Sequence, residues 1–236
     1  MVYFSISEVI DKAWELTKKF GLVLIVVYFV LELIQYVIGQ LFTPAIDQNA
    51  LSAAISEQDW KTIMEMYYSN PTGTILGSII GAIITLGFMN CVLQMAKGKA
   101  DSVSFDFWKQ DVMVYVNYVV VSIIVKILTY LGLLLCIVPG LYIGARFNFA
   151  EVCAIDHPEK GIMGCLSYSW KMTEGNAMNI MGLIIVQLFI LAIGIAMCCI
   201  GILPAAVIVA FADVVAYLIL SNYFNESEKS DFVEAE

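Results

Sequence analysis

Long apolar stretches alternate with short polar ones along the whole chain. Six segments are apolar enough to cross a membrane, at 21–41, 74–96, 112–136, 140–155, 177–199 and 205–223. About 20 helical residues span the roughly 30 Å of hydrocarbon, since each residue rises about 1.5 Å. The pattern predicts an all-α, polytopic membrane bundle of six transmembrane helices. The fourth segment is short and contains Arg146 and Glu151, so we expect it to be tilted or partly unwound.

A segment of mixed polarity precedes each pair of apolar segments, at 5–20, 104–111 and 161–176. In the first, apolar residues recur on one helical face while lysines and acids occupy the rest. Such helices lie in the headgroup layer with tryptophan at the boundary, so we expect cytoplasmic interfacial helices here. The long acidic connection 43–73 contains a further amphipathic pattern over 49–68, which predicts one helix ended by Asn70 and Pro71.

The order of interfacial helix, span, turn and span occurs three times, at about 5–96, 104–156 and 161–224. The stretches Trp14–Thr17 and Trp170–Thr173 are the most alike copies. This favours three parallel helix-hairpin repeats inside one membrane domain, 1–224, although interfacial Trp-Lys helices also recur by chance. The acidic tail 225–236 is predicted to be disordered.

Composition supports membrane insertion. The chain is 61% hydrophobic and 14% charged, against about 25% charged residues in a soluble domain. The net charge of -9 is concentrated in the tail and one acidic loop, and no basic patch supports nucleic-acid binding. Membrane lipids are therefore the expected partners, together with a second copy of the chain or another membrane protein.

The lysines predict the topology. Nine of them fall on the side that carries both termini, and Lys61 alone falls on the other. Positive residues remain on the cytoplasmic side, so both termini should be cytoplasmic in a multi-pass protein of the cell (inner) membrane. The first apolar run is too long for the core of a signal peptide and predicts an uncleaved signal anchor.

The cysteine pattern argues against a metal site. The six cysteines have no CxxC spacing, and the chain has one histidine, so we expect no metal and small apolar packing roles for most thiols. A disulfide among Cys136, Cys198 and Cys199 is the alternative.

Four charged residues fall inside the predicted spans and form an intramembrane charged cluster. At about 1.5 Å per residue their depths agree within roughly 6 Å. Each would cost about 2.5–3.5 kcal/mol facing lipid at a helix centre, so we expect them to face inward. The four are Glu32, Lys126, Arg146 and Asp213, and Glu151, Gln35, Asn148 and Gln187 are candidates to join them.

Two interpretations of this layer remain open. Glu32 with Lys126, and Arg146 with Asp213, would make interhelical ion pairs that fix the packing, which we favour. Alternatively, the layer is a polar cavity that binds an ion, a proton or a lipid headgroup.

A glycine pattern in the second span predicts close helix packing. Gly73, Gly77 and Gly81 repeat at every fourth residue, and small residues at this spacing let helix backbones approach. Packing within the chain is favoured over a dimer contact.

The stretches PGLYIGARFNFA (139–150) and SYSWKMTEGN (167–176) resemble a pattern in poorly characterised prokaryotic six-helix integral membrane proteins. That family includes the membrane domain attached to some glycerophosphoryl diester phosphodiesterases. The resemblance covers mainly 112–224 and implies a six-helix inner-membrane protein without an established activity. The matching residues are Pro139, Gly140, Tyr142, Arg146, Ser169, Trp170, Thr173, Gly175 and Asn176.

Motifs for catalysis are absent from the sequence. It has no P-loop, GxSxG or HExxH, so we predict no catalytic residues, no cofactor and no enzyme activity. His157 is expected to be a solvated turn residue. The favoured function is organising, protecting or scaffolding the membrane; the alternatives are a small transporter or channel-like protein that uses the charged layer and, third, a lipid-binding or lipid-acting enzyme.

Overall fold

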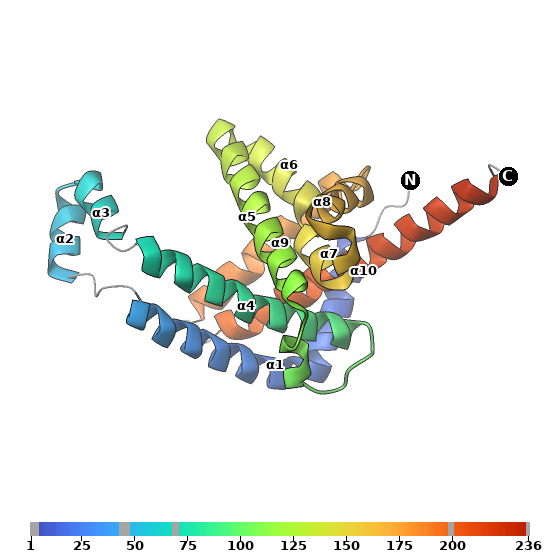
Figure 1. Ribbon diagram of the computed structural model, residues 1–236, viewed down its shortest axis with the longest axis horizontal. Coiled ribbons are helices and arrows are strands. Elements are labelled where there is room, and N and C mark those ends of the chain that lie inside the picture. The colour runs from blue at the N-terminus through green and yellow to red at the C-terminus, as the bar shows by residue number, and fades with distance from the viewer. Residues whose placement is uncertain (1–4, 43–47, 68–70, 198–200, 235–236) are drawn as a thin grey trace. The chain divides into compact units, whose positions relative to one another are not determined.

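The computed structural model describes residues 5–42, 48–67, 71–197 and 201–234, and within these ranges all regular structure is helical. Figure 1 shows the order of the helices. They are α1 (Ile6–Phe42), α2 (Gln48–Ser56), α3 (Trp60–Tyr67), α4 (Pro71–Ala96), α5 (Val112–Leu135), α6 (Ile137–Phe147), α7 (Ala150–Asp156), α8 (Gly161–Met172), α9 (Ala177–Ala196) and α10 (Ile202–Glu234), with short 3-10 helices η1 (Phe105–Trp108) and η2 (Pro158–Lys160).

Among the described residues, five helices are long and apolar enough to cross a membrane. The segments are Ile6–Gln40, Leu76–Ala96, Val112–Leu135, Ala177–Ala196 and Ile202–Glu226, with mean hydropathies between 2.0 and 2.4. This is the pattern of a multi-pass membrane protein.

The fourth predicted span is broken. Residues 140–155 fall on α6 and α7, which are separated at Asn148 and Phe149. Phe149 has φ -98° and ψ 1°, outside helical geometry. Just before Phe149, Arg146 contacts Trp170 of α8 and Asn148 donates to Asp213 of α10. The described structure therefore does not show a sixth continuous spanning helix.

The chain forms two compact units. One comprises Met1–Tyr28 and Leu86–Glu236, and the other Phe29–Thr85. In the second unit, the connection predicted to hold one amphipathic helix holds two, α2 and α3. They are separated at Gln58, whose φ of 55° is left-handed. The prediction of a single helix was wrong because a residue in this conformation ends an α-helix.

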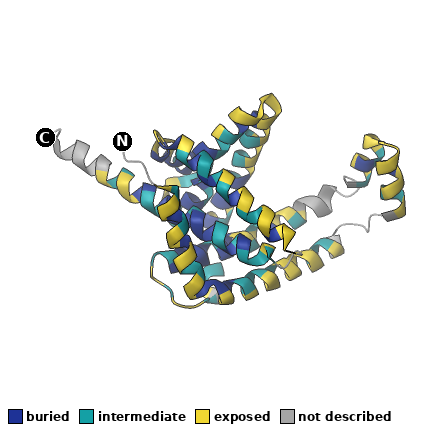
Figure 2. Ribbon diagram, turned by 180° about the vertical axis from the view of Figure 1, so that it is seen from behind, coloured by how far each residue is buried: buried dark blue, intermediate teal, exposed yellow. Residues whose placement is uncertain are grey.

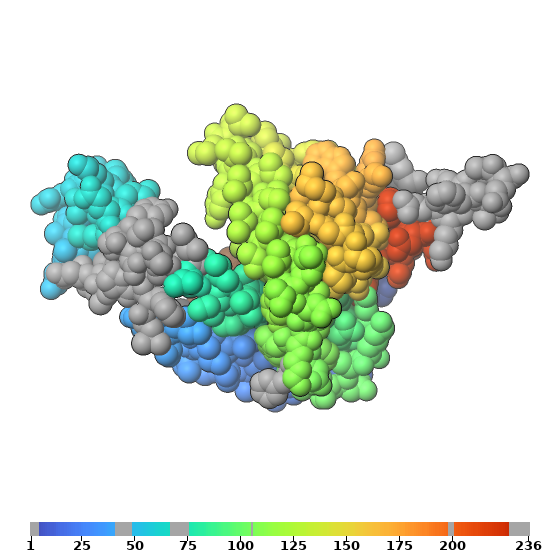
Figure 3. All heavy atoms as spheres, viewed as in Figure 1, coloured from blue at the N-terminus to red at the C-terminus, as the bar shows by residue number. Residues whose placement is uncertain are grey.

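The larger unit is built around α5 and its neighbours. Helix α5 packs on α6, α7 and α8, and α9 packs on α6 and α10. Figure 2 shows buried residues gathered in the middle of this unit, while the turn joining α5 to α6 is exposed. At that turn Leu134 and Leu135 are 83% and 81% exposed, and Figure 3 shows their end of the hairpin projecting at the surface. An apolar turn of this kind suits lipid as its surroundings.

The three predicted interfacial segments have different structures. The first is not separate, because α1 continues from Ile6 through Gly21 to Phe42. The second contains only η1, which is capped by the Ser104 hydroxyl accepting from the Asp106 amide. The third is a separate helix, α8. It is divided from α9 by a turn in which Gly175 has φ 78°.

Two further predictions concern the acidic tail and the cysteines. The helix continues to Glu234, so the tail predicted to be disordered is helical up to that residue. Cys136 is a free, exposed thiol. Cys198 and Cys199 lie outside the described residues, so the disulfide raised as an alternative among these three cysteines lies outside them too.

Candidate functional site

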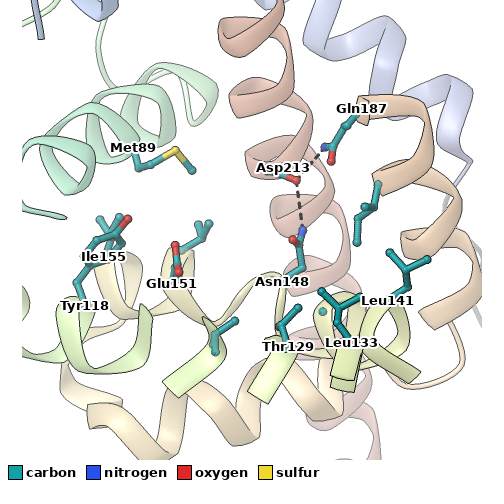
Figure 4. Close-up of a pocket in the computed structure, with 15 residues that line it drawn as sticks. Met89, Tyr118, Thr129, Leu133, Leu141, Asn148, Glu151, Ile155, Gln187 and Asp213 are labelled. Carbon is teal, nitrogen blue, oxygen red and sulfur yellow. Dashed lines mark hydrogen bonds between the residues drawn. The ribbon is translucent and has the colours of Figure 1, made fainter. Parts of the chain in front are cut away.

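Three polar side chains come together from the turn between α6 and α7 and from helices α9 and α10. Asn148 Nδ2 donates to Oδ1 of Asp213 on α10 at 3.2 Å, and Gln187 Nε2 on α9 donates to the same oxygen at 2.9 Å. Figure 4 shows both amides pointing toward the carboxylate. Asp213 is thereby held in one orientation by two neutral donors.

Asp213 lines a cavity of about 360 Å³. Glu151 on α7 lines it as well, on the side toward Tyr118 and Met89 (Figure 4). The remaining wall is mainly apolar, and Thr129 of α5 adds a hydroxyl. Two carboxylates thus share one cavity whose wall comes from α4, α5, α6, α7, α9 and α10.

The cavity lining has an excess of acidic side chains. Its lining, as far as the structure describes it, contains Glu151 and Asp213 but no lysine or arginine. Two like charges in a site of low dielectric repel each other strongly, and a cation placed between them relieves that repulsion. Within the described part of the chain, no group of histidine, cysteine, aspartate or glutamate is arranged as a metal site.

Arg146 does not pair with Asp213, so that prediction was wrong. Its guanidinium lies over the ring of Trp170 on α8, with Cζ 4.2 Å from the ring centroid. The two residues following Arg146 explain the difference. Asn148, on the other side of the turn, occupies the position against Asp213, and Phe147 packs its ring on Trp170 at 5.2 Å.

The motif in α8 fixes the backbone at Arg146. The carbonyl oxygen of Arg146 accepts from Ser169 Oγ at 2.9 Å and from Thr173 Oγ1 at 3.3 Å. Both hydroxyl residues are fully buried. Gly175 supplies the left-handed residue of the turn that follows, and buried Asn176 comes next to it. These residues of the two resembling stretches therefore form one structural unit.

Pro139, Gly140 and Tyr142 lie at the other end of α6. Pro139 occupies the first turn, where its missing amide hydrogen costs no hydrogen bond. At Gly140 the helix meets α5 closely, because an added Cβ would lie 2.7 Å from the backbone nitrogen of Leu133. Tyr142 is largely exposed, so it belongs to the surface of α6.

Glu32 and Lys126 are both exposed on the unit that carries them. Neither side chain is enclosed within its own unit. Helical depth had been read from the sequence, but the rotation of each side chain about its helix axis had not. Glu32 belongs to the smaller unit and Lys126 to the larger one, so their pairing stays a prediction.

The three glycines of α4 differ in their surroundings. A Cβ added at Gly81 would lie 2.8 Å from the amide nitrogen of Gln35 on α1, while one added at Gly77 would meet nothing within 4 Å. The surroundings of Gly73 lie outside the described side chains. Close packing within the chain is therefore shown at Gly81 and not at Gly77.

A second polar cluster was missed in the sequence. Lys97, just after the end of α4, forms an ion pair with Asp156 at the end of α7, and Tyr217 Oη donates to the same carboxylate at 3.1 Å. His157 is half-buried, with Nδ1 3.0 Å from Glu159 and Nε2 3.6 Å from Asp156. His157 lies in the connection between α7 and η2, as predicted for a turn residue, but it is only partly solvated and has two carboxylate neighbours. Lys97, Asp156 and Tyr217 lie far apart in the chain, and no spacing signal joins them.

Comparison of the chain with protein-family models, with curated proteins and with solved structures finds no match.

Proposed function

We propose that this protein binds a small cation, or a proton, in its acidic cavity and moves it across the membrane without enzymatic chemistry. The observation that supports the proposal is the placement of Asp213 and Glu151 in one cavity. The interpretation favoured from the sequence, interhelical ion pairs that fix the packing, required Arg146 to neutralise Asp213. Arg146 instead stacks on Trp170.

The dimensions of the cavity suit such a ligand. A volume of about 360 Å³ lies at the lower end of small-molecule sites, which measure roughly 300–1,000 Å³. The hydrogen bonds that Asn148 and Gln187 donate to Asp213 both end on Oδ1, so Oδ2 keeps lone pairs for a ligand. Carboxylates buried at membrane depth are characteristic of ion and proton pathways.

The proposed membrane placement uses six crossings. In this arrangement α6 and α7 together form the remaining crossing, since residues 137–156 would extend about 30 Å as near-continuous helix. A broken helix is tolerated at membrane depth where it lines a polar cavity. The lysine distribution supports cytoplasmic termini, and the membrane we propose is the inner one. The resemblance to the six-helix family supports the same arrangement.

The test is cation flux into liposomes containing the purified protein. Proton flux is followed with a trapped pH-sensitive dye, and Rb⁺ uptake is followed in parallel. The variants Asp213→Asn and Glu151→Gln keep size and hydrogen bonding while removing charge from the cavity. Glu32→Gln is the matched control, because it removes an exposed carboxylate from a different unit.

We expect wild type and Glu32→Gln to conduct equally and each cavity variant to lose at least tenfold in rate. Wild-type protein that conducts neither ion, or cavity variants that match it, would refute the transport function.

A membrane-organising or scaffolding role is the second candidate. It is favoured by the exposure of Trp14 on α1 and Trp170 on α8, since tryptophan anchors helices at the headgroup boundary. Recovery of the intact protein in a complex with another membrane protein or with itself, combined with absent flux, would support this role.

A further inference from the structure

Arg146 is a buried cation whose charge no carboxylate balances. It is 4% exposed, and its Nε is buried without a hydrogen-bond partner. Among the described residues, no aspartate or glutamate lies within ion-pair distance of the guanidinium. Within the described part of the chain, its guanidinium contacts the face of Trp170.

This arrangement is costly unless a ligand completes it. Removing a guanidinium from water is compensated in proteins by an anion and by hydrogen bonds to its N–H groups. An aromatic face and the end of a helix offset part of that cost, but neither accepts a hydrogen bond in the plane of the guanidinium. None of the described contacts supplies an acceptor in that plane.

The choice of residue points to the type of acceptor. Arg146 is the single arginine among the 12 basic residues of the chain, and the other 11 are lysines. Arginine presents a planar fork of donors that matches phosphate in a two-pronged contact, whereas lysine offers a point charge. This chain uses lysine at every other basic position and arginine at the most buried of the described ones.

The surroundings hold the fork in place. The carbonyl of Arg146 is fixed by the hydroxyls of Ser169 and Thr173, and Phe147 packs on the same tryptophan. Trp170 is 39% exposed, so this packed unit reaches the surface of the protein beside Arg146. Asn176, in the turn after α8, contributes the other buried side-chain atom without a partner, Oδ1.

We propose that Arg146, framed by Trp170, binds a phosphate group. In a membrane protein the group comes either from a phospholipid headgroup or from soluble phosphate, and the chemistry of recognition is the same. This site is distinct from the acidic cavity, because Arg146 is absent from the described cavity lining. It does not depend on the proposed transport function.

The first experiment is native mass spectrometry of the full chain in mild detergent. The probes are phosphatidylglycerol, a diacylglycerol with the same acyl chains but no phosphate, and inorganic phosphate. Arg146→Gln removes the fork, and Lys171→Gln is the matched control because it removes an exposed cation from the same part of α8. Far-UV circular dichroism checks that each variant keeps its helical content.

We expect wild type and Lys171→Gln to retain phosphatidylglycerol with equal affinity, and Arg146→Gln to bind it at least tenfold more weakly. Diacylglycerol should show no dependence on Arg146. An effect with the lipid alone identifies the headgroup as the source, and an equal effect with inorganic phosphate identifies the soluble anion. Equal binding of every probe by folded Arg146→Gln and wild type would overturn the proposal, as would an equal dependence of diacylglycerol binding on Arg146.

A second measurement needs no variant. Phenylglyoxal modifies arginine side chains, so in this chain it reports on Arg146 alone. Phosphatidylglycerol or inorganic phosphate should slow the modification of wild-type protein at least fivefold, as read by peptide mass, while diacylglycerol should not. If neither phosphate compound slows it more than diacylglycerol does, the site is not a phosphate site.

Discussion

The contact between α5 and α6 can be tested at a single glycine. In Gly140→Ala the added Cβ would lie 2.5 Å from Leu133 Cγ and 2.7 Å from the Leu133 backbone nitrogen. The side chain of Leu133 is exposed and can rotate away, but its backbone cannot. Moving that nitrogen from 2.7 Å to the 3.4 Å of ordinary contact requires a shift of about 0.7 Å between the helices.

Gly144→Ala is the matched control. Gly144 lies one turn later on α6, and its added Cβ would meet Thr129 of the same neighbour, α5, at an ordinary 3.6 Å. Both substitutions gain roughly 0.5–1 kcal/mol of helix propensity, and only the first adds overpacking, which typically costs about 1–3 kcal/mol. Because the propensity gain is common to both, the difference between the two variants measures the clash directly.

The assay is unfolding in mild-detergent micelles by added dodecyl sulfate, followed by far-UV circular dichroism. We expect Gly144→Ala to be as stable as wild type or slightly more stable, and Gly140→Ala to be less stable than Gly144→Ala by about 1–3 kcal/mol. Equal stability of the two alanine variants would refute the close approach of α5 and α6 at Gly140.

Two further predictions concern hydroxyl groups. Ser169→Ala and Thr173→Val should each lower the free energy of unfolding by about 0.5–1.5 kcal/mol, and the double variant should lose more than either, because the Arg146 carbonyl then has no hydroxyl donor; equal stability of the double variant and wild type would contradict this. At the start of α3, hydrogen bonds from the Thr62 hydroxyl and amide lower the pKa of Asp59 below its usual 3.8, so the stability that this cap gives is present above that pH and is lost as pH falls through the lowered pKa. A carboxyl titration by nuclear magnetic resonance should show the midpoint of Asp59 rising in Thr62→Val, and an unchanged midpoint would refute the role of the hydroxyl.

The positions of the spanning helices could be predicted because lipid imposes a length and a composition. The apolar segments 112–136 and 177–199 correspond closely to Val112–Leu135 and Ala177–Ala196. The continuity of α1 from its amphipathic start into its apolar span could not be predicted from the pattern alone. One glycine, Gly21, stands between the amphipathic and the apolar parts, and a single glycine is tolerated inside a helix at a cost of about 1 kcal/mol.

The candidate site was predicted in part. The sequence drew attention to Asp213 and named Glu151, Asn148 and Gln187 as candidates to join it, and the structure places these four around one cavity. Depth in the membrane follows from counting residues, so this grouping could be predicted from the sequence. The partner of Arg146 could not be predicted, because pairing depends on how each side chain is rotated about its helix axis, and residue counting gives only its depth.

Helical geometry at the end of α6 explains why the two chemistries separate, since Asn148 keeps helical backbone angles. In an unbroken helix, residues two apart point about 200° away from each other, since each residue turns by about 100°. Arg146 and Asn148 lie on either side of the end of α6, and they turn to opposite neighbours: the cation to α8 and the amide to α10. Asp213 therefore meets a neutral donor where the sequence suggested a positive charge. A neutral partner leaves the carboxylate free to attract a cation, and it leaves the guanidinium free to attract an anion. Both proposed sites thus depend on the same local feature, the end of α6 at Phe147.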